Sequence, residues 1–405
     1  MKWLKFAFLN ALRNRRRSAV TLSIAALGTA AILLAAGFAE FTYQGLAESA
    51  ARDAGHLVVA RSEHFLREED TPLQYGIGNY PELRERLLAD SEVRYLLPRI
   101  SFSGLVSNGD KSVIMMGTGI DPDSEFLVKG PFLTIKSGQL LDSRHQGVPQ
   151  VLLGDTLAKT LNVHPGSGLT LLTSTTEGAL NAVDVEVRGT FSTGVPDYDK
   201  RAIYTDLPTA QQLLVTQNIS QLGVYLSDMK QADSARARIE KTAGKGFTAQ
   251  TWRDQAFYYE SVRSLYNRIF GALGGIIAMI VLFVVANAMS MAIVERTREI
   301  GTLRALGTLP AQLIRSFAME GAVLGGAGAC AGALLALAIS IALLFADLKM
   351  PPPPGHSVGY PLAVAINPLI YLLVVAGITA LATLCAALVS RHSARKPIVE
   401  ALAHV

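Results

Sequence analysis

The sequence predicts a membrane protein with four transmembrane helices in a 1+3 arrangement and a large α+β extracytoplasmic domain raised on helical stalks. Four stretches predict the helices, because each runs for 20 residues or more without Asp, Glu, Lys or Arg: 18–39, 269–294, 321–346 and 350–390. At about 1.5 Å per helical residue, each can cross a bilayer core about 30 Å thick. The long segment 41–267 mixes strand patterns such as "PQVLLG" with helix patterns, which predicts an α+β domain. Its two ends read as helical continuations of the neighbouring spans, which predicts the stalks.

The first apolar stretch has two interpretations. Basic residues, an apolar core and the small residues "GFA" before Glu40 are typical of a cleaved signal peptide. The apolar run is longer than the roughly 7–15 residues of a signal-peptide core, however, and an amphipathic stretch with Leu4, Phe8 and Leu12 on one helical face precedes it. These two departures favour an uncleaved anchor.

Basic residues near the spans predict the orientation of the chain. Residues 1–17 carry six basic and no acidic side chains, the stretch 295–315 carries four and two, and the tail 391–405 carries three and one. Because Lys and Arg concentrate on the cytoplasmic side, we expect both termini and 295–315 in the cytoplasm, and 41–267 outside it. The outer segment has 22 basic and 27 acidic side chains, so the formal net charge of +4 comes from the membrane edges. A membrane surface explains this charge, and no nucleic-acid partner is expected.

The predicted segments follow one another along the whole chain. They are a cytoplasmic amphipathic helix (1–17), a first span (18–40), the extracytoplasmic domain with its stalks (41–267, middle lobe about 110–219), a second span (268–294), a short charged cytoplasmic helix (295–315), a third span (316–346), a proline-rich outer loop (347–365), a fourth span (366–390) and a cytoplasmic tail (391–405). Asn367 as N-cap and Pro368 at the first helical position predict where the fourth helix begins. The proline run "MPPPPGHSVGYP" is either a rigid spacer or a lip that contacts a substrate or partner.

Small residues at four-residue spacing predict close helix packing in two spans. They are Gly271 and Gly275 in the second span, and Gly321, Gly325, Gly328 and Gly332 in the third. This pattern suits either the packing of the bundle or a dimer face.

The sequence contains no catalytic constellation. Its seven histidines form no HExxH pair or close cluster, so no metal site is expected. The stretch "GDTLAKT", 154–160, lacks the second glycine of a phosphate-binding loop, so we expect no cofactor on this chain and ATP hydrolysis, if used, on a partner. Glu40 and Glu320 stand only at the ends of apolar stretches, which disfavours a proton or ion path through the membrane. The charged loop at 197–201 reads as a solvated turn.

The charged stretch between the second and third spans reads as one short helix over 294–306. In this helix Glu295 and Glu299 share a face, Gly307 ends it as a C-cap, and Pro310 suits the start of the next helix. It is either a handle for a cytoplasmic partner or a solvated loop whose long side chains snorkel at the membrane surface.

This stretch also carries a resemblance. The sequence "VERTREIGTLRALGTLPAQLIRSFAMEG" resembles the coupling-helix signature of the MacB/FtsX family of ABC transporter permeases. The matching residues are Glu295, Arg296, Arg298, Glu299, Ile300, Gly301, Leu303, Arg304, Ala305, Gly307 and Glu320. The tail "SARKPIVEALAHV", the outer segment "PQVLLGDTLAKTLNVHPGSGLTLL" and the 1+3 arrangement resemble the family too, so the resemblance covers essentially the whole chain.

The resemblance implies a permease of a bacterial inner membrane that works as a homodimer or heterodimer. Its partners would be two copies of a separate cytoplasmic ABC ATPase, which bind ATP and Mg, and a periplasmic carrier or adaptor is compatible with it. The coupling helix would dock on the ATPase, and its motion would pass to the outer domain by mechanotransmission. The fused exporters of the family carry an ATPase domain before the first span, which this sequence lacks; its layout is nearer to the Lol-type lipoprotein-releasing permeases.

Three functions remain in view. The first is a permease that extracts or exports a lipoprotein, lipid or other amphiphile at the outer leaflet. The second is an FtsX-like regulator that switches an extracytoplasmic partner, such as a cell-wall hydrolase, and transports nothing. The third is a membrane-anchored ectoenzyme, which the missing catalytic set disfavours.

Overall fold

The structure is a computed structural model that describes residues 15–67, 69–129, 133–145, 147–346, 348–350 and 361–393. The predicted N-terminal helix (1–17), the tail (391–405) and the proline-rich loop (347–365) therefore lie largely outside the described residues. The chain divides into two compact units. The membrane unit comprises Met1–Gln44, Ser261–Lys349 and Pro361–Val405, and the outer unit comprises Gly45–Glu260 and Met350–Tyr360.

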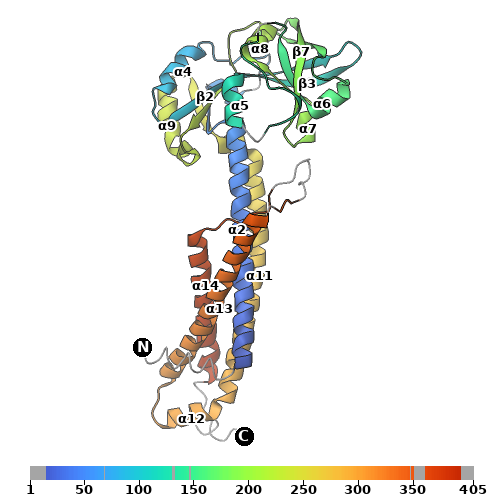
Figure 1. Cartoon of the computed structure of the whole chain (residues 1–405). Coiled ribbons are helices and arrows are strands. Elements are labelled where there is room, and N and C mark those ends of the chain that lie inside the picture. The colour runs from blue at the N-terminus through green and yellow to red at the C-terminus, as the bar shows by residue number, and fades with distance from the viewer. Residues whose placement is uncertain are drawn as a thin grey trace. The chain divides into compact units, whose positions relative to one another are not determined.

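Four long helices dominate the membrane unit (Figure 1): α2 (Arg15–Ala54), α11 (Phe257–Glu295), α13 (Pro310–Ala346) and α14 (Pro368–Ser393). Within the described residues, four helices are long and apolar enough to cross a membrane, and they are these four. The four-span prediction is therefore confirmed. Both α2 and α11 continue as helix past the limits predicted for their spans, as expected for the stalks.

Small and aliphatic side chains from all four helices form one buried cluster in the membrane unit. Its members are Ala25 of α2; Val281, Val285 and Met289 of α11; Leu324 and Ala329 of α13; and Ile378, Ala382, Cys385 and Ala386 of α14. Lipid tails are as apolar as these side chains, so tight packing rather than the hydrophobic effect holds such helices together. Small residues permit that packing because they allow the helix axes to approach.

Local capping fixes where two of these helices begin. The side-chain carbonyl of Asn367 accepts from the backbone N–H of Leu369 at 3.1 Å, and Pro368 occupies the first helical position, as the sequence predicts. The amide of Asn367 also donates to the Glu40 carboxylate at 2.9 Å, which ties the start of α14 to α2. At the start of α13, the side chain of Gln312 accepts from the N–H of Leu309 at 3.2 Å. Each contact satisfies a backbone or side-chain group at a helix start that would otherwise lack a partner.

The outer unit alternates short strands and helices. Its strands are β1 (Leu57–Arg61), β2 (Val93–Ser107), β3 (Ser112–Ile120), β4 (Thr134–Gly138), β5 (Gln150–Gly154), β6 (Gly168–Ser174), β7 (Leu180–Ser192), β8 (Ala202–Asp206), β9 (Gln221–Leu226) and β10 (Phe247–Thr251). Its helices are α3 (Ser62–Leu66), α4 (Tyr80–Leu88), α5 (Pro122–Lys129), α6 (Asp155–Leu161), α7 (Pro196–Asp199), α8 (Leu207–Leu214), the 3-10 helix η2 (Met229–Gln231), α9 (Ala232–Ala243) and α10 (Trp252–Gln255). This mixture confirms the predicted α+β outer domain.

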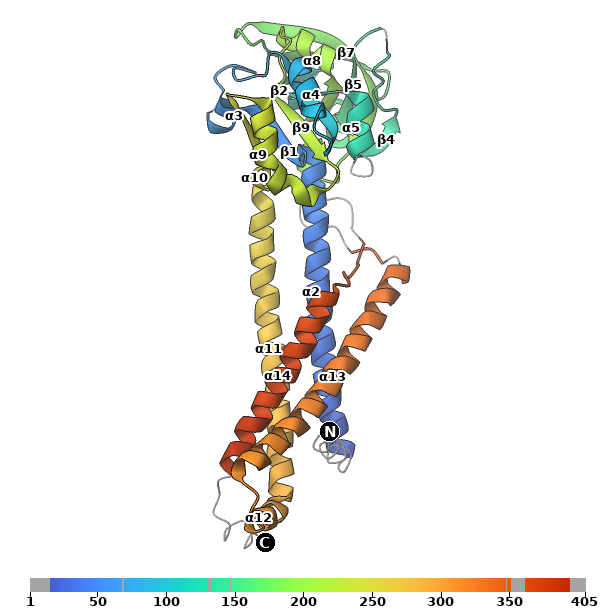
Figure 2. The ribbon, with the colours of Figure 1, turned by 90° about the vertical axis from the view of Figure 1, so that its left-hand side faces the viewer.

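The long strand β2 joins two lobes of the outer unit. Its first part pairs with β9, which continues through β1 to β10, and α4 and α9 lie in this first lobe (Figure 2). Its second part pairs with both β3 and β6. Because β3 pairs with β8, β8 with β5, β5 with β7 and β7 with β6, six of the described strands close into a ring. A closed ring leaves its member strands without exposed edges, which guards against strand-to-strand aggregation.

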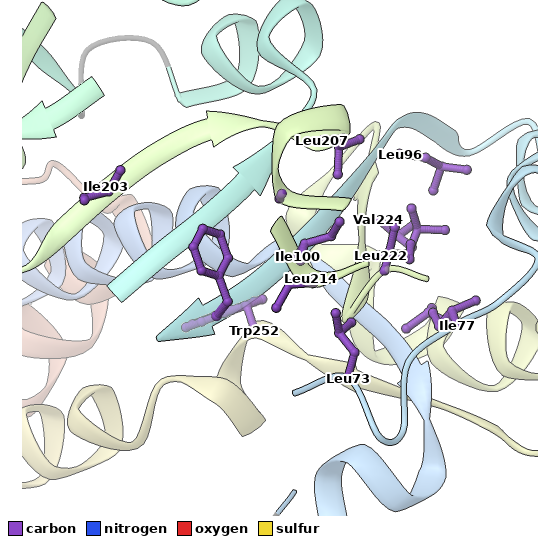
Figure 3. Close-up of a cluster of buried hydrophobic side chains, with 14 of the residues drawn as sticks. Leu73, Ile77, Leu96, Ile100, Ile203, Leu207, Leu214, Leu222, Val224 and Trp252 are labelled. Carbon is purple, nitrogen blue, oxygen red and sulfur yellow. The ribbon is translucent and has the colours of Figure 1, made fainter. Parts of the chain in front are cut away.

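One large core lies under the strands of both lobes. Figure 3 shows part of it, including Ile100 of β2, Leu222 and Val224 of β9, Leu214 of α8 and Trp252. Fully burying one such aliphatic side chain stabilises a fold by about 1.5–3 kcal/mol, so this cluster dominates the stability of the outer unit. A smaller cluster, which includes Phe191 and Tyr204, packs separately beside α5 and β4.

Candidate functional site

The charged stretch between α11 and α13 forms a helix of its own, α12 (Thr297–Ala305; Figure 1). A single helix over 294–306 is wrong, because α11 ends at Glu295 and Arg296 adopts a non-helical backbone (φ −110°, ψ 18°) between the two helices. Glu295 and Glu299 therefore lie on different helices, at the end of α11 and within α12. The cause is a tertiary contact of Arg296.

Arg296 forms a buried ion pair with Glu320 of α13. Its guanidinium lies 3.3 Å from the Glu320 carboxylate, and the two residues are only 6% and 3% exposed. The carbonyl of Arg296 meanwhile accepts from the N–H of Ile300 at 2.9 Å, which makes Arg296 the first acceptor of α12. One residue thus ends α11, starts α12 and anchors both to α13.

An apolar cluster fixes the inner face of α12. Ile300 packs with Ile293 of α11 and with Leu313 and Phe317 of α13, and all four side chains are buried. Gly301, the neighbour of Ile300, is buried as well. A helix with one buried stripe and one polar face is held at a fixed rotation about its own axis, so α12 presents a defined outer face.

Gly307 closes α12 at its other end. Its φ is +96°, the N–H of Thr308 donates to the carbonyl of Leu303 at 3.0 Å, and the N–H of Gly307 donates to the backbone carbonyl of Arg304 at 3.0 Å. This pair of bonds is a Schellman motif, which requires a left-handed residue and so favours glycine. The predicted C-cap is confirmed by this geometry.

The residues predicted to dock on a partner separate into two sets. Glu295, Arg298, Glu299 and Gly307 are exposed, and Arg304 is half-buried. Arg296 and Gly301 are buried and act within the chain instead.

Sequence reasoning named Leu303 only as part of the family signature and missed Leu306 and Leu309 on this exposed side. Leu303 is 42% exposed, Leu306 is 79% exposed and Leu309 is 61% exposed. Leu303 and Leu306 follow the buried Ile300 at a spacing of three residues, a signal that could have located them, because on a helix this spacing turns each side chain further from the buried stripe. Leu309 lies beyond Gly307, where α12 has ended.

The predicted packing glycines also divide into two sets. A Cβ on Gly321 or Gly325 would collide with alanines of α14, and one on Gly328 would lie 2.7 Å from the Cβ of Ala25 of α2. A Cβ on Gly332 would collide with the carbonyl oxygen of Ala26, which is also in α2. These four permit close approach between helices of the same chain.

Gly271 and Gly275 of α11 behave differently. Among the described residues, nothing lies within 4 Å of a Cβ built at either position. Of the two roles open to this pair, packing within the chain is therefore not observed, and a dimer face stays a prediction.

In the charged loop at 197–201 of the outer unit, which was expected to be a solvated turn, one acidic residue is buried. Asp199 is 2% exposed and accepts from the Ser192 hydroxyl at 2.7 Å, the Thr193 hydroxyl at 2.7 Å and the Thr193 N–H at 3.0 Å. The expectation of a solvated loop is thus wrong for Asp199, because its carboxylate organises the turn from inside. Within the described part of the chain, no group of three His, Cys, Asp or Glu side chains is placed to hold a metal ion.

Comparisons with known proteins agree with this architecture. The FtsX-like permease C-terminal family model matches residues 271–398, which include α12, and the MacB-like periplasmic core domain model matches residues 18–242. The second model alone covers more than half of the chain.

Individual relatives match over shorter stretches. The lipoprotein-releasing system transmembrane protein LolC of Xylella fastidiosa (strain 9a5c) is 26% identical over 253 residues, which are 61% of this chain and 60% of that protein. The macrolide export ATP-binding/permease protein MacB of Nitrobacter winogradskyi is 28% identical over 236 residues, which are 54% of this chain and 34% of that protein. This chain thus spans less than two thirds of the length of either relative. Among solved structures, the periplasmic region of MacB from Actinobacillus actinomycetemcomitans matches 52% of this chain and 95% of that one, at 19% identity and a TM-score of 0.37. The two family models together show that the chain belongs to the FtsX-like and MacB-like family of ABC transporter permeases.

Proposed function

We propose that this chain is the permease subunit of an ABC transporter in a bacterial inner membrane, with both termini and α12 in the cytoplasm. ATP and Mg bind to a separate ATPase, two copies of which act with two permease chains, the second being a copy or a paralogue. ATP hydrolysis drives movements of the outer unit that extract or export a lipoprotein, lipid or other amphiphile. The relatives support this substrate class, since one is named as lipoprotein-releasing and another as a macrolide exporter.

The structure of α12 is the observation that carries the proposal. It is a short helix whose inner face is fixed by Ile300 and by the Arg296–Glu320 pair, and whose outer face carries charged side chains beside exposed leucines. An ATPase groove that takes such a helix gains apolar contact from Leu303 and Leu306 and orientation from Arg298 and Glu299.

The buried anchor gives α12 a mechanical role. Because Arg296 lies between α11 and α12 and pairs with α13, a push on α12 displaces the ends of two spans together. A helix attached only by exposed side chains would instead rotate against its neighbours. Energy released on a separate subunit could in this way enter a chain that does not itself hydrolyse ATP.

Charge reversal on the outer face of α12 tests the docking role. We expect Glu299→Lys combined with Arg304→Glu to abolish co-purification of the ATPase, and Leu306→Asp to do the same by removing apolar contact. Lys159→Glu is the matched control, because Lys159 is an exposed lysine of the outer unit whose side chain is 75% exposed. Membrane insertion should be unchanged in all variants. Full retention of the ATPase by both α12 variants would refute the docking role.

A trapped complex tests the substrate class. The chain is purified with a hydrolysis-deficient ATPase and examined by lipid and protein mass spectrometry, with the Leu306→Asp variant as the control preparation. An amphiphile enriched over that control supports transport.

The alternative is an FtsX-like regulator of an extracytoplasmic partner; the FtsX-like permease C-terminal model matches residues 271–398, from α11 to α14. It predicts a stable extracytoplasmic protein partner in the same preparation, with no enriched amphiphile.

A further inference from the structure

Side chains from three elements of the outer unit converge on the last turn of α2. The carbonyls of the last four residues of a helix lack intrahelical partners and carry partial negative charge. Here the guanidinium of Arg99, from β2, donates to the carbonyls of Asp53 and Ala54, the latter at 3.2 Å. The hydroxyl of Tyr225, from β9, donates to the carbonyl of Arg52 at 2.8 Å.

Arg99 is held in this position by a second, buried contact. Its guanidinium forms a forked ion pair with the Glu125 carboxylate of α5, at 2.8 Å and 3.1 Å, and the two residues are 5% and 0% exposed. It also donates to the Tyr225 hydroxyl at 3.0 Å. Burial opposes the charge of Arg99, but the adjacent Glu125 carboxylate outweighs this effect and raises the pKa of Arg99.

Lys129, one turn after Glu125 in α5, adds a further link. Its ammonium donates to the Tyr204 hydroxyl of β8 at 2.7 Å and lies 3.5 Å from Glu125. It also lies 3.3 Å from the Asp53 carboxylate, which is exposed, so this contact is weaker than the buried pair. Figure 1 shows α5 beside the end of α2.

The contacts bridge the two lobes of the outer unit as well as α2. Arg99 and Tyr225 belong to the β2–β9 part of the first lobe, whereas α5 follows β3 and Tyr204 lies in β8, both of the ring of strands. The residue after α2, Gly55, has φ +121°, a conformation that favours glycine and takes the chain out of the helix into β1. Arg99 links the chain on the two sides of Gly55. It lies in β2, which follows Gly55 in the sequence, and it donates to the carbonyls of the two residues before Gly55.

The connection at α11 is built differently. α10 and α11 are separated by Ala256, whose backbone is non-helical (φ −96°, ψ 66°). Across this break the ring of Trp252 meets the ring of Tyr259 edge-on, with centroids 5.0 Å apart. Such an aromatic contact permits sliding and tilting, whereas forked hydrogen bonds to a guanidinium fix both distance and direction.

We propose that Arg99, Glu125 and Lys129 form a rigid joint that fixes the last turn of α2 to both lobes, so that displacement of α2 moves the outer unit instead of bending the chain at Gly55. These three are positioning residues. The inference rests on the proposed function for its consequence, but the stiffness of the joint does not depend on ATP.

Two spin-label pairs separate stiffness from transmission, in the full chain with its co-purified ATPase in lipid nanodiscs. Cys330 and Cys385 are first replaced by alanine. Labels at Gly45→Cys and Glu177→Cys report on the joint; nothing lies within 4 Å of a Cβ at Gly45, and Glu177 is an exposed residue between β6 and β7. Labels at Leu348→Cys, which is 50% exposed, and Glu177→Cys report on ATP-driven motion. Distance distributions are measured with and without ATP–vanadate.

The test variant replaces the buried pair by apolar residues of similar size, Arg99→Met with Glu125→Leu. We expect the narrow Gly45–Glu177 distribution of the parent protein to become broad, and the ATP–vanadate shift of the Leu348–Glu177 distance to be lost, while the ATPase stays bound. The control is Arg238→Met with Glu92→Leu, the same chemical change at an ion pair of the outer unit whose side chains are 45% and 40% exposed. It should behave as the parent does.

Each possible result supports or overturns either the joint or the proposed function. A narrow Gly45–Glu177 distribution in the test variant overturns the joint. If ATP–vanadate does not shift the Leu348–Glu177 distance in the parent protein, that result counts against the proposed function. The joint is then tested by the Gly45–Glu177 distribution alone. If the test variant aggregates, it is replaced by Lys129→Met with Asp53→Asn, which leaves Arg99 and Glu125 in place. An unchanged Gly45–Glu177 distribution in that variant overturns the role assigned to Lys129. Restored narrow distances in Arg99→Lys would show that charge alone suffices, which contradicts the fork.

Discussion

Truncation of Arg296 tests the anchor of α12 most directly. At a separation of 3.3 Å, the attraction between the Arg296 and Glu320 charges is about 5 kcal/mol for an effective dielectric constant of about 20. Much of this gain only offsets the cost of removing both groups from water. Arg296→Met, however, leaves the Glu320 carboxylate buried and without this partner, and breaking a buried pair in that way typically costs about 3–5 kcal/mol. That cost shifts the unfolding equilibrium by about 100-fold or more.

The measurement is equilibrium unfolding of the purified chain in mixed micelles, followed as the denaturing detergent is titrated. We expect Arg296→Met and Glu320→Leu each to lower the unfolding midpoint, and the double variant to recover most of the loss, because it no longer buries one member of this ion pair without the other. Arg298→Met is the control, since Arg298 is exposed on the same stretch. Additive single effects in the double variant, or a loss no larger than that of Arg298→Met, would refute the anchor.

Three further predictions follow from single residues. Burial lowers the pKa of His56; the charge of Asp228 opposes this shift and that of Arg52 reinforces it. The unfolded chain therefore binds more protons than the folded chain, so the outer unit has its full stability above about pH 6.5 and loses stability as the pH drops below it. In His56→Gln, the melting temperature followed by Trp fluorescence should depend less on pH. Gly325→Leu overpacks the contact with Ala382 and should cost about 1–3 kcal/mol in the same micelle titration, whereas Gly271→Leu should leave the midpoint unchanged. Gly307→Ala forces a non-glycine residue to φ +96°, which should destabilise the end of α12 by about 1 kcal/mol. Amide hydrogen exchange at the end of α12 should therefore become about fivefold faster. Unchanged exchange would contradict the Schellman geometry.

The features that were predicted correctly are those encoded locally. The four spans follow from charge-free stretches, since a bilayer responds to composition and length alone. Gly307 and Asn367 were identified because capping involves residues within one turn of each other. The stalks followed from helix patterns that run on from the spans, although the second pattern is broken at Ala256, between α10 and α11.

The features that were missed depend on partners distant in sequence. The break at Arg296 is caused by Glu320, 24 residues away, and nothing in the local helix pattern reveals it. The ring of strands depends on β6 pairing with β2, across more than 60 residues, and strand patterns do not specify such pairing. Asp199 and Arg99 resemble surface charges in sequence, because burial of a charge is determined by its partners.

The two regions proposed to transmit movement share the same chemical arrangement. In each, an arginine follows or meets the C-terminal end of a long helix and is paired with a buried glutamate: Arg296 with Glu320 after α11, and Arg99 with Glu125 at the end of α2. A buried ion pair adds little net stability compared with apolar residues of the same size, so stability alone does not account for two of them. What such a pair does provide is direction, because a planar guanidinium binds a carboxylate and helix carbonyls only at defined angles. An apolar contact would hold these helix ends equally well but would let them slide. Fixed geometry at both places is what a chain needs if its role is to pass on a displacement rather than to absorb it.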